Sequence, residues 1–293
     1  YMVEHPGGKE KLALRYDRSV PLSRVVAQYP DLPKPFRRYQ IAPVWRAERP
    51  QKGRYREFYQ CDADIVGSAS MLADAEIVAL IYTILRRLGF ELYRCIDKLD
   101  KIGLDGVREE LLKAGLNAGM ADRVLGVLRP EGRASAFPGQ TGLSVLDDLR
   151  RTLSDYPLAV EGISELQELL YYLPALGVAG EFYRVDLAMV RGLDYYTGPI
   201  YETVVEKPRI GSITGGGRFD GLVGMFSTQS LPATGTTIGI ERIVDVMEEL
   251  EMVSADLGGT VVQVLVTVFS PDLIEGSLKL VTELRNAGLS CEL

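Results

Sequence analysis

The stretch from Phe36 to Gly67, "FRRYQIAPVWRAERPQKGRYREFYQCDADIVG", contains two segments in which apolar and polar residues alternate. A period of two residues is typical of a β-strand, because successive side chains of a strand point to opposite faces. The polar loop between the segments, "ERPQKGRY", contains Pro50 and Gly53, which favour turns. The stretch therefore predicts an antiparallel hairpin with a long loop, belonging to an antiparallel sheet.

The loop and its flanks carry an unusual concentration of positive charge. The whole chain has 33 Lys and Arg against 40 Asp and Glu, a net charge of −7. The segment from Lys34 to Phe58 nevertheless contains only two acidic residues and eight basic ones. The basic residues are Lys34, Arg37, Arg38, Arg46, Arg49, Lys52, Arg54 and Arg56. A basic patch on an acidic chain suggests a site for a polyanion, and the alternative is a solvated charged surface.

The second strand of the hairpin places polar side chains on one face. By the alternation of a strand, this face holds Phe58, Gln60, Asp62 and Asp64. Carboxylate and amide oxygens can accept hydrogen bonds from an ammonium group or an imidazole N–H, which makes Gln60 and Asp64 candidates for binding such a ligand. An exposed polar face of the sheet is the equally plain alternative.

The rest of the chain predicts an α+β protein with four parts. Apolar residues at three- and four-residue spacing predict a helix from Met71 to Gly89, and short helical patterns without strand signals fill 97–180. Strands are predicted at "FYRVDLAMV", "GPIYETVVEK", "IGSITGGG" and within "ATGTTIGI", and a strand, helix and strand follow from Thr260. We expect a catalytic core in 1–96 and 181–254, a helical insertion in 97–180, and the start of a C-terminal α/β domain in 255–293.

Composition argues against several classes of site. The sole histidine is His5, and Cys61, Cys95 and Cys291 lie far apart, which disfavours a zinc site and a histidine-based catalytic triad. Runs of apolar residues fall short of the roughly 20 that a membrane span needs. The chain begins at Tyr1, so we expect that the natural N-terminus is missing. The sequence therefore gives no basis for judging whether a targeting segment exists.

Two further segments carry residues that suit a ligand better than a core. The run "RGLDYYTGPIYE" from Arg191 contains an arginine, a glycine and adjacent tyrosines where a core strand would favour Val, Ile or Leu. Three consecutive glycines, Gly215 to Gly217, allow a ligand to approach the backbone closely, although a β-bulge would also explain them.

Four segments, taken together, resemble histidyl-tRNA synthetase, a class II aminoacyl-tRNA synthetase of the eukaryotic and archaeal type. "RAERPQKGRYREFYQCDADIVG" resembles class motif 2 and "GIERI" motif 3, while "RGLDYYTG" and "GGGRFDGL" resemble the two histidine-specific signatures. The resemblance implies a class II antiparallel sheet and the ligation of histidine to tRNA(His) through histidyl-adenylate, with ATP and Mg²⁺. It also implies an anticodon-binding domain at the C-terminus, a cytoplasmic location (an organellar copy is the alternative) and a homodimer, whose motif 1 would precede Tyr1.

The resemblance assigns roles to individual residues. Arg46 and Arg191 would grip the α-phosphate from opposite sides and are the expected catalytic residues. The expected ATP-binding residues are Arg46, Glu48, Arg54, Tyr55, Phe58 and Arg242. The expected histidine-binding residues are Asp17, Ser19, Gln60, Asp64, Arg191, Tyr195, Tyr196, Phe219 and Gly235. A metal site made by the protein alone is not expected, because Mg²⁺ would arrive with ATP.

Two departures and one alternative accompany this assignment. Ser19 stands where the family commonly has Thr, and Phe219 where it usually has Tyr, so one hydroxyl is lost. The alternative function is that of a catalytically inactive relative, a regulatory or tRNA-sensing module. Such a relative would be expected to lose one or more phosphate-binding arginines, whereas Arg46, Arg54, Arg191 and Arg242 are all present.

Overall fold

The protein is described here by a computed structural model that covers residues 1–293. The structure describes residues 1–4, 7–8, 11–90, 108–109, 112, 117–119, 122, 125–126, 136–186, 189, 195–205, 207–208, 210–253 and 262–293. The described residues divide into two compact units, Tyr1–Val246 and Met247–Leu293.

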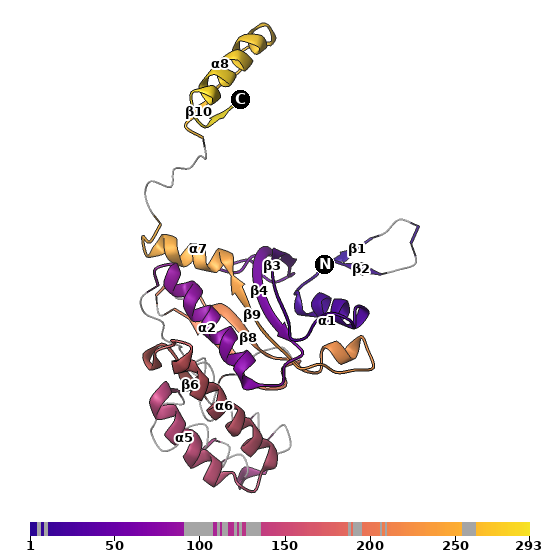
Figure 1. Ribbon diagram of the computed structural model, residues 1–293, viewed down its shortest axis with the longest axis vertical. Helices are drawn as coiled ribbons and strands as arrows, with labels where there is room; N and C mark the ends of the chain where they lie inside the picture. The colour runs from indigo at the N-terminus through magenta and orange to yellow at the C-terminus, as the bar shows by residue number, and fades with distance from the viewer. Residues whose placement is uncertain are drawn as a thin grey trace. The chain divides into compact units, whose positions relative to one another are not determined.

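The predicted hairpin is present and forms one side of a five-stranded sheet. Strand β3 (Phe36–Trp45) pairs antiparallel with β4 (Glu57–Val66) over ten residues, from Phe36 opposite Val66 to Trp45 opposite Glu57. β4 continues into β9 (Ala233–Gly239), β9 into β8 (Ser212–Arg218) and β8 into β7 (Ile200–Val204), all antiparallel. Figure 1 shows these strands crossing the middle of the unit.

Helices cover this sheet and confirm the α+β class. Helix α2 (Met71–Arg87) follows β4 and contacts β4, β8 and β9. Its N-cap is Ser70, whose hydroxyl accepts the N–H of Leu72 at 3.2 Å and so satisfies one of the free amides of the first turn. Helix α1 (Ser19–Gln28) packs with the 3₁₀ turn Val223–Met225, and α7 (Ile240–Glu249) continues directly from β9.

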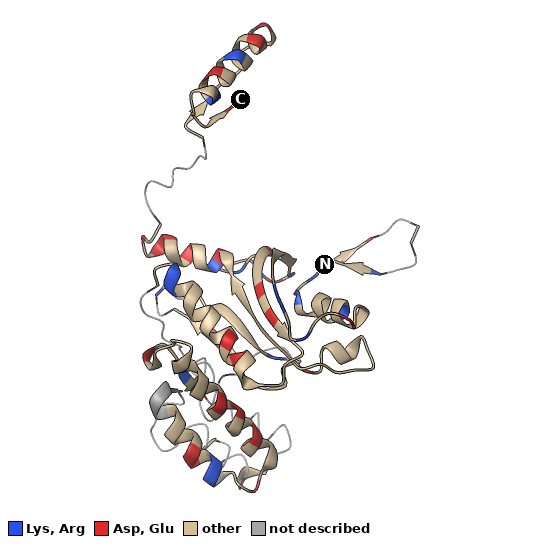
Figure 2. Cartoon of the chain, in the orientation of Figure 1, with Lys and Arg blue, Asp and Glu red and all other residues tan. Residues whose placement is uncertain are grey.

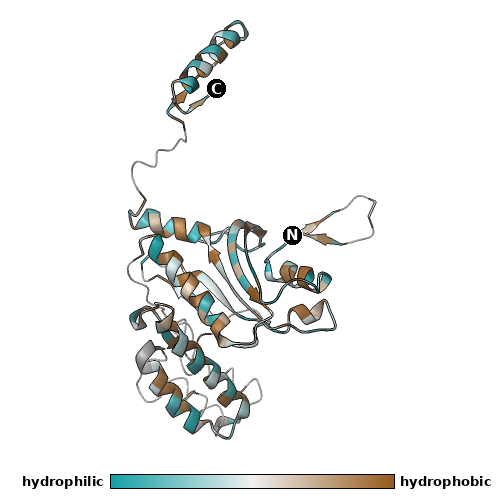
Figure 3. Cartoon of the chain, viewed as in Figure 1, coloured by the Kyte–Doolittle hydropathy of each residue, from teal (hydrophilic) through white to brown (hydrophobic). Residues whose placement is uncertain are grey.

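A second layer of the first unit is built from α5 (Gly139–Thr152) and α6 (Pro157–Ala175). Both helices carry apolar and polar positions in turn (Figure 3), as expected where one face of a helix is buried. Their apolar faces form one hydrophobic core with α2. The buried residues of this core include Ala75, Leu146, Leu170 and Leu173.

The prediction of a purely helical segment in 97–180 was wrong at one point. Strand β5 (Ala136–Pro138) lies inside that range and pairs antiparallel with β6 (Arg184–Asp186). The strand predicted at "FYRVDLAMV" therefore forms, but in this two-stranded pair and not in the five-stranded sheet. The helical patterns in 105–116 and 120–128 fall mostly outside the described residues.

Shorter elements complete the two units. β1 (Met2–Val3) pairs antiparallel with β2 (Leu12–Ala13), and a 3₁₀ turn spans Gly180–Phe182. In the second unit, β10 (Val264–Leu265), the 3₁₀ turn Pro271–Leu273, α8 (Ile274–Asn286) and β11 (Cys291–Glu292) follow in order, and β10 and β11 are parallel. The predicted strand–helix–strand succession is thus confirmed, while the predicted domain boundaries stay a prediction.

Candidate functional site

A polar cavity of about 450 Å³ lies against the five-stranded sheet, and most of the predicted site residues line it. Its walls come from the loop before α1, from β4, β8 and β9, from the β3–β4 loop and from the start of α7. The predicted residues in the lining are Asp17, Ser19, Arg46, Glu48, Arg54, Tyr55, Phe58, Gln60, Tyr195, Tyr196 and Arg242. Segments that are more than two hundred residues apart in the sequence thus meet at one cavity.

One end of this cavity gathers three guanidinium groups. Arg242 donates to the carbonyls of Gly53 and Ser212, which fixes it between the β3–β4 loop and β8. Burial lowers the pKa of Arg242, and the positive charges of Arg54 and Arg46 lower it further. Cations held close enough to repel one another form a natural site for an anion, because a bound anion relieves the repulsion.

The other two arginines are placed by weaker contacts. The Arg46 guanidinium lies 5.2 Å above the centre of the Phe58 ring, and its Nε donates to the Tyr16 carbonyl at 3.1 Å. Arg54 pairs with Glu48 at 3.3 Å, with both side chains about half exposed. These contacts leave the charges near the cavity and exchangeable for a stronger partner such as a phosphate.

The β3–β4 loop is shaped so that its backbone can approach Ile210, which precedes β8. Gly53 has a φ of +69°, and a Cβ there would meet Cγ1 of Ile210 at 2.3 Å. The next aromatic residue, Tyr55, donates its hydroxyl proton to Asp245 of α7 at 3.0 Å. The loop predicted to hold the outer phosphates is thereby tied to the helix that carries Arg242.

A buried and acidic part of the lining, here called the acidic end, lies close enough to Arg46 for that cation to act on Asp17. Asp17 accepts the N–H of Val20 on Oδ1 at 3.3 Å, and its Oδ2 is buried without a hydrogen-bond partner among the described residues. Burial raises the pKa of Asp17. Oε1 of Gln60 is also buried and unpaired in the described part of the chain. Unpaired buried acceptors are destabilising in the free protein, so they indicate a place where a ligand supplies donors.

Asp62 belongs to this acidic end, although we did not predict it as a binding residue. Its Oδ1 accepts the hydroxyl proton of Thr237, and its side chain lines the cavity. Burial raises the pKa of Asp62 to about 6. The strand alternation that selected Gln60 and Asp64 also includes Asp62, and Figure 2 shows the acidic positions along β4.

Asp64, an expected histidine-binding residue, is buried and does not line the cavity. Its carboxylate pairs with Arg38 of β3 at 2.9 Å and is 3% exposed, and burial raises its pKa to about 7. Gly235 on β9 faces it, because a Cβ at that position would lie 2.1 Å from Oδ1 of Asp64. The absence of a side chain at Gly235 thus makes room for the carboxylate, and the proposed contact of Asp64 with a ligand stays a prediction.

Phe219, near the aromatic wall of the cavity, is a second expected binding residue, after Asp64, that does not line the cavity. The rings of Tyr195 and Tyr196 lie 4.8 Å apart, and both line the cavity. Phe219 packs edge-on behind Tyr195 at 6.1 Å, in an apolar cluster with Leu22, Val66 and other buried side chains. The hydroxyl that Phe219 lacks, compared with the family's usual Tyr, would therefore belong to this apolar cluster. Arg191 lies outside the described residues, so its role stays a prediction.

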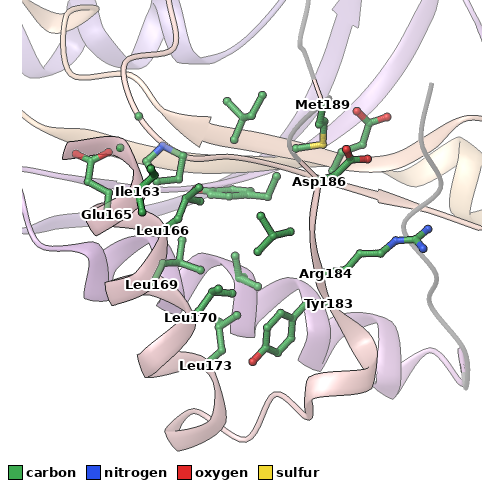
Figure 4. A pocket seen from close by; sticks show the side chains of 18 of the residues that line it. Ile163, Glu165, Leu166, Leu169, Leu170, Leu173, Tyr183, Arg184, Asp186 and Met189 are labelled. Atoms are coloured by element: carbon green, nitrogen blue, oxygen red, sulfur yellow. The ribbon is translucent and has the colours of Figure 1, made fainter. Parts of the chain in front are cut away.

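A larger cavity, of about 810 Å³, lies between α2, α6 and β7. Figure 4 shows the leucines of α6 (Leu166, Leu169, Leu170 and Leu173) along one side and Tyr183 and Met189 on the other. The polar residues Glu165, Arg184 and Asp186 stand among mostly aliphatic side chains. None of the predicted site residues lines this cavity except Tyr196, which borders both cavities.

Two kinds of feature are absent from the described residues. No group of three or more His, Cys, Asp or Glu side chains there is arranged to hold a metal ion. Among the described helices, none combines the length and the hydropathy that crossing a membrane requires.

Comparisons with known proteins agree on one family. The family model described as histidyl-tRNA synthetase matches residues 2–243. A histidine–tRNA ligase of Aeropyrum pernix is 44% identical over 99% of this chain and 70% of its own length. The crystal structure of histidyl-tRNA synthetase from Nostoc sp. PCC 7120 aligns with a TM-score of 0.76 at 30% identity, over 100% of this chain and 72% of that one.

A third comparison shows the fold alone. An ATP phosphoribosyltransferase regulatory subunit/histidyl-tRNA synthetase from Bacillus halodurans aligns with a TM-score of 0.72 over 99% of this chain and 76% of that one, at 21% identity. Catalytic and regulatory proteins can share one fold, so the residues of the site must decide between them.

Proposed function

This chain belongs to the histidyl-tRNA synthetase family, and from that premise we propose how its polar cavity carries out the family's reaction. The activity is that of a histidine–tRNA ligase, an enzyme of protein synthesis. It joins histidine to ATP as histidyl-adenylate, and then transfers the histidyl group to tRNA. The single observation that carries the proposal is the polarity of the cavity, whose lining combines three neighbouring cations with buried carboxylates.

The reaction needs both ends at once. A carboxylate oxygen of histidine attacks the α-phosphorus of ATP, the bond to the bridging oxygen of the β-phosphate breaks, and pyrophosphate leaves. Negative charge builds up at the α-phosphate in this displacement, so fixed cations there stabilise the transition state more than the ground state. Arg46, which lines the cavity, is proposed for this role, and Arg191 is proposed to act from the opposite side.

ATP is proposed to lie along the cationic end. Arg54 and Arg242 would bind the outer phosphates, since Arg242 is already fixed by the Gly53 and Ser212 carbonyls. The adenine would stack on the Phe58 ring, over which the Arg46 guanidinium lies in the free protein. Glu48 would accept from the adenine amino group or contact Mg²⁺, and Tyr55 would hold the loop in place through Asp245.

Histidine is proposed to lie at the acidic end. Asp17 and Gln60 offer unpaired buried acceptors to the α-ammonium group, with Ser19 beside them. The imidazole would lie against Tyr195 and Tyr196, with Asp64 as the deeper acceptor. A cavity whose buried polar groups are satisfied only by an imidazole rejects apolar amino acids, which would leave those groups unpaired.

The remaining partners follow from the family and are proposals. Mg²⁺ is expected on the phosphates of ATP, as the family implies. Residues 255–293 would begin the anticodon-binding domain. The protein is proposed to act as a homodimer in the cytoplasm.

The test is histidine-dependent exchange of labelled pyrophosphate into ATP by the full-length protein. We expect exchange with histidine and none with phenylalanine or leucine, since the side chain of neither offers a donor to the polar groups that would meet the imidazole. Absence of exchange with histidine, in a protein that still binds ATP, would favour the inactive regulatory alternative.

A further inference from the structure

A buried arginine at the end of β8, to which no role was assigned, is joined to the beginning of α2. Arg218 is the last residue of β8 and is 2% exposed. Its Nη1 donates to the Ser68 carbonyl at 3.1 Å, and its Nη2 donates to the Ser70 carbonyl at 3.1 Å. Nη2 also pairs with the carboxylate of Asp74, which is 0% exposed. The planar guanidinium thus fixes the end of β8 to the first turn of α2 and the residues before it.

The backbone of Arg218 holds the loop that carries the tyrosines of the polar cavity. Its carbonyl accepts the N–H of Thr197 at 2.8 Å, and its own N–H donates to the Pro199 carbonyl at 2.9 Å. Gly198 packs on the arginine side chain, since a Cβ there would lie 2.9 Å from Cδ of Arg218. Main chain and side chain of one arginine therefore contact three successive residues of this loop.

Asp220 adds a second connection between the guanidinium and the same loop. Its Oδ1 accepts from Nη1 of Arg218 at 3.3 Å, and its N–H donates to the hydroxyl of Thr197 at 2.9 Å. Burial acts to lower the pKa of Arg218, but the carboxylates of Asp74 and Asp220 outweigh it, so that the pKa is raised. Arg218 is therefore a permanent cation, and the connection does not depend on pH.

Tyr196 lies against the same end of β8. A Cβ at Gly217 would be 2.8 Å from Cδ1 of the Tyr196 ring, so the ring occupies the place that a side chain would take. Tyr196 lines the polar cavity, where the imidazole is proposed to meet it. The place of this ring at the cavity therefore depends on where the end of β8 is held.

The loop has less support on its other side. Residues 196–199 also line the larger cavity of about 810 Å³. A segment that borders a cavity has fewer packing contacts than one inside a close-packed core. The hydrogen bonds to Arg218 and Asp220 therefore contribute more to the position of the loop than they would in a tightly packed surrounding.

We propose that Arg218 is a positioning residue for histidine binding, which holds the loop of residues 195–199 so that Tyr196 faces the polar cavity. This inference rests on the proposed function, which places the imidazole against Tyr195 and Tyr196. An arginine needed for stability alone would change the amount of folded protein and leave the KM for histidine of the folded molecules unchanged. A positioning residue changes the KM for histidine selectively, because ATP is proposed to lie against other side chains.

The test measures the KM for histidine and the KM for ATP in pyrophosphate exchange by Arg218→Lys. Lysine keeps a positive charge beside Asp74 but lacks the planar fork that reaches the Ser68 and Ser70 carbonyls together. We expect the KM for histidine to rise roughly 10- to 100-fold, because a displacement of about 1 Å in a binding group can cost that much, and the KM for ATP to stay within about threefold. Urea unfolding checks that the variant is folded.

Gly198→Ala approaches the same contact from the loop. The added Cβ would press on Cδ of Arg218 and displace the loop, while every charged group stays in place. We expect the same selective rise in the KM for histidine. The matched control is Gly221→Ala, at an exposed glycine where an added Cβ would meet nothing within 4 Å, and both KM values should match wild type.

The outcomes separate the proposal from a purely structural role. An unchanged KM for histidine in folded Arg218→Lys would overturn the proposal, and so would equal rises for histidine and ATP. If Arg218→Lys does not fold, Gly198→Ala decides by the same two criteria. Absence of exchange by the wild-type protein would instead overturn the proposed function.

Discussion

The two cavities of the first unit differ in size and in the polarity of their walls. The larger cavity is mostly aliphatic, and the smaller one is polar. The larger one, about 810 Å³, is walled by side chains such as Leu169 and Leu173 that also form the core beneath it. The smaller one, about 450 Å³, is walled by guanidiniums, carboxylates and tyrosines, several of them buried and unpaired. Aliphatic walls stabilise the fold, whereas buried unpaired polar groups weaken it and persist where a ligand needs them.

The first prediction tests whether the two cavities differ in their importance for the reaction. Arg46→Ala should lower histidine-dependent pyrophosphate exchange by about 10²–10³-fold, because it removes a donor to the charge that develops at the α-phosphate. The matched control is Arg184→Ala, which removes an arginine from the wall of the larger cavity. Its exchange rate should stay within about twofold of wild type. Equal losses in the two variants would contradict the distinction between the cavities.

The second prediction tests the larger cavity in the same way. Leu173→Ala, at a residue that is 1% exposed, should lower the free energy of unfolding by about 2–4 kcal/mol through lost apolar burial and a larger void. Urea denaturation measures this change. Exchange per folded molecule should be unchanged, and a loss of exchange in fully folded protein would show that the larger cavity takes part in catalysis.

The third prediction uses pH to identify the strained carboxylate of the smaller cavity. The pKa of Asp62 is about 6 in the folded protein, above its ordinary value, so its contribution to stability is present at acid pH and is lost as pH rises through about 6. Asp62→Asn resembles the protonated form. The variant should therefore gain stability relative to wild type between pH 5 and pH 8, by on the order of 1–3 kcal/mol. Urea midpoints that shift equally at both pH values would contradict this.

The smallest effect is expected at the rim of the polar cavity. Tyr55→Phe removes a hydroxyl that donates to Asp245 at 3.0 Å between partly exposed groups. The free energy of unfolding should fall by about 0.5–1 kcal/mol, and the KM for ATP should rise less than threefold because the loop is only loosened. A tenfold rise in that KM would mean that Tyr55 contacts ATP directly.

Patterns that depend on neighbours in sequence were predictable. The alternation in "FRRYQIAPVWRAE" and "REFYQCDADIVG" gave the correct hairpin, because each strand reports its own two faces. The pairing of β5 with β6 was not predictable, since strands of three residues carry too little alternation to recognise and are separated by an entire pair of helices. Contacts between distant segments decide such short strands.

The candidate site likewise contains residues that the sequence could predict and residues that it could not. The resemblance selected eleven residues that line the polar cavity, but it carried no information on depth, so Asp64 and Phe219 lie behind the wall. Asp62 and Arg218 were missed because their importance lies in their burial and in the contacts that burial gives them, which only the packed structure shows. The alternation along β4 could have indicated Asp62, whereas no pattern in the sequence connects Arg218 with its distant partner Asp74.

A crystal structure of the full-length protein with histidine and a non-hydrolysable ATP analogue tests the central claim most directly. The account predicts both ligands in the polar cavity, with the α-phosphate at Arg46, the adenine on Phe58 and the imidazole at the end that holds Asp17 and Asp62. Ligand density in the larger cavity between α2 and α6, or histidine at the arginine end, would contradict it.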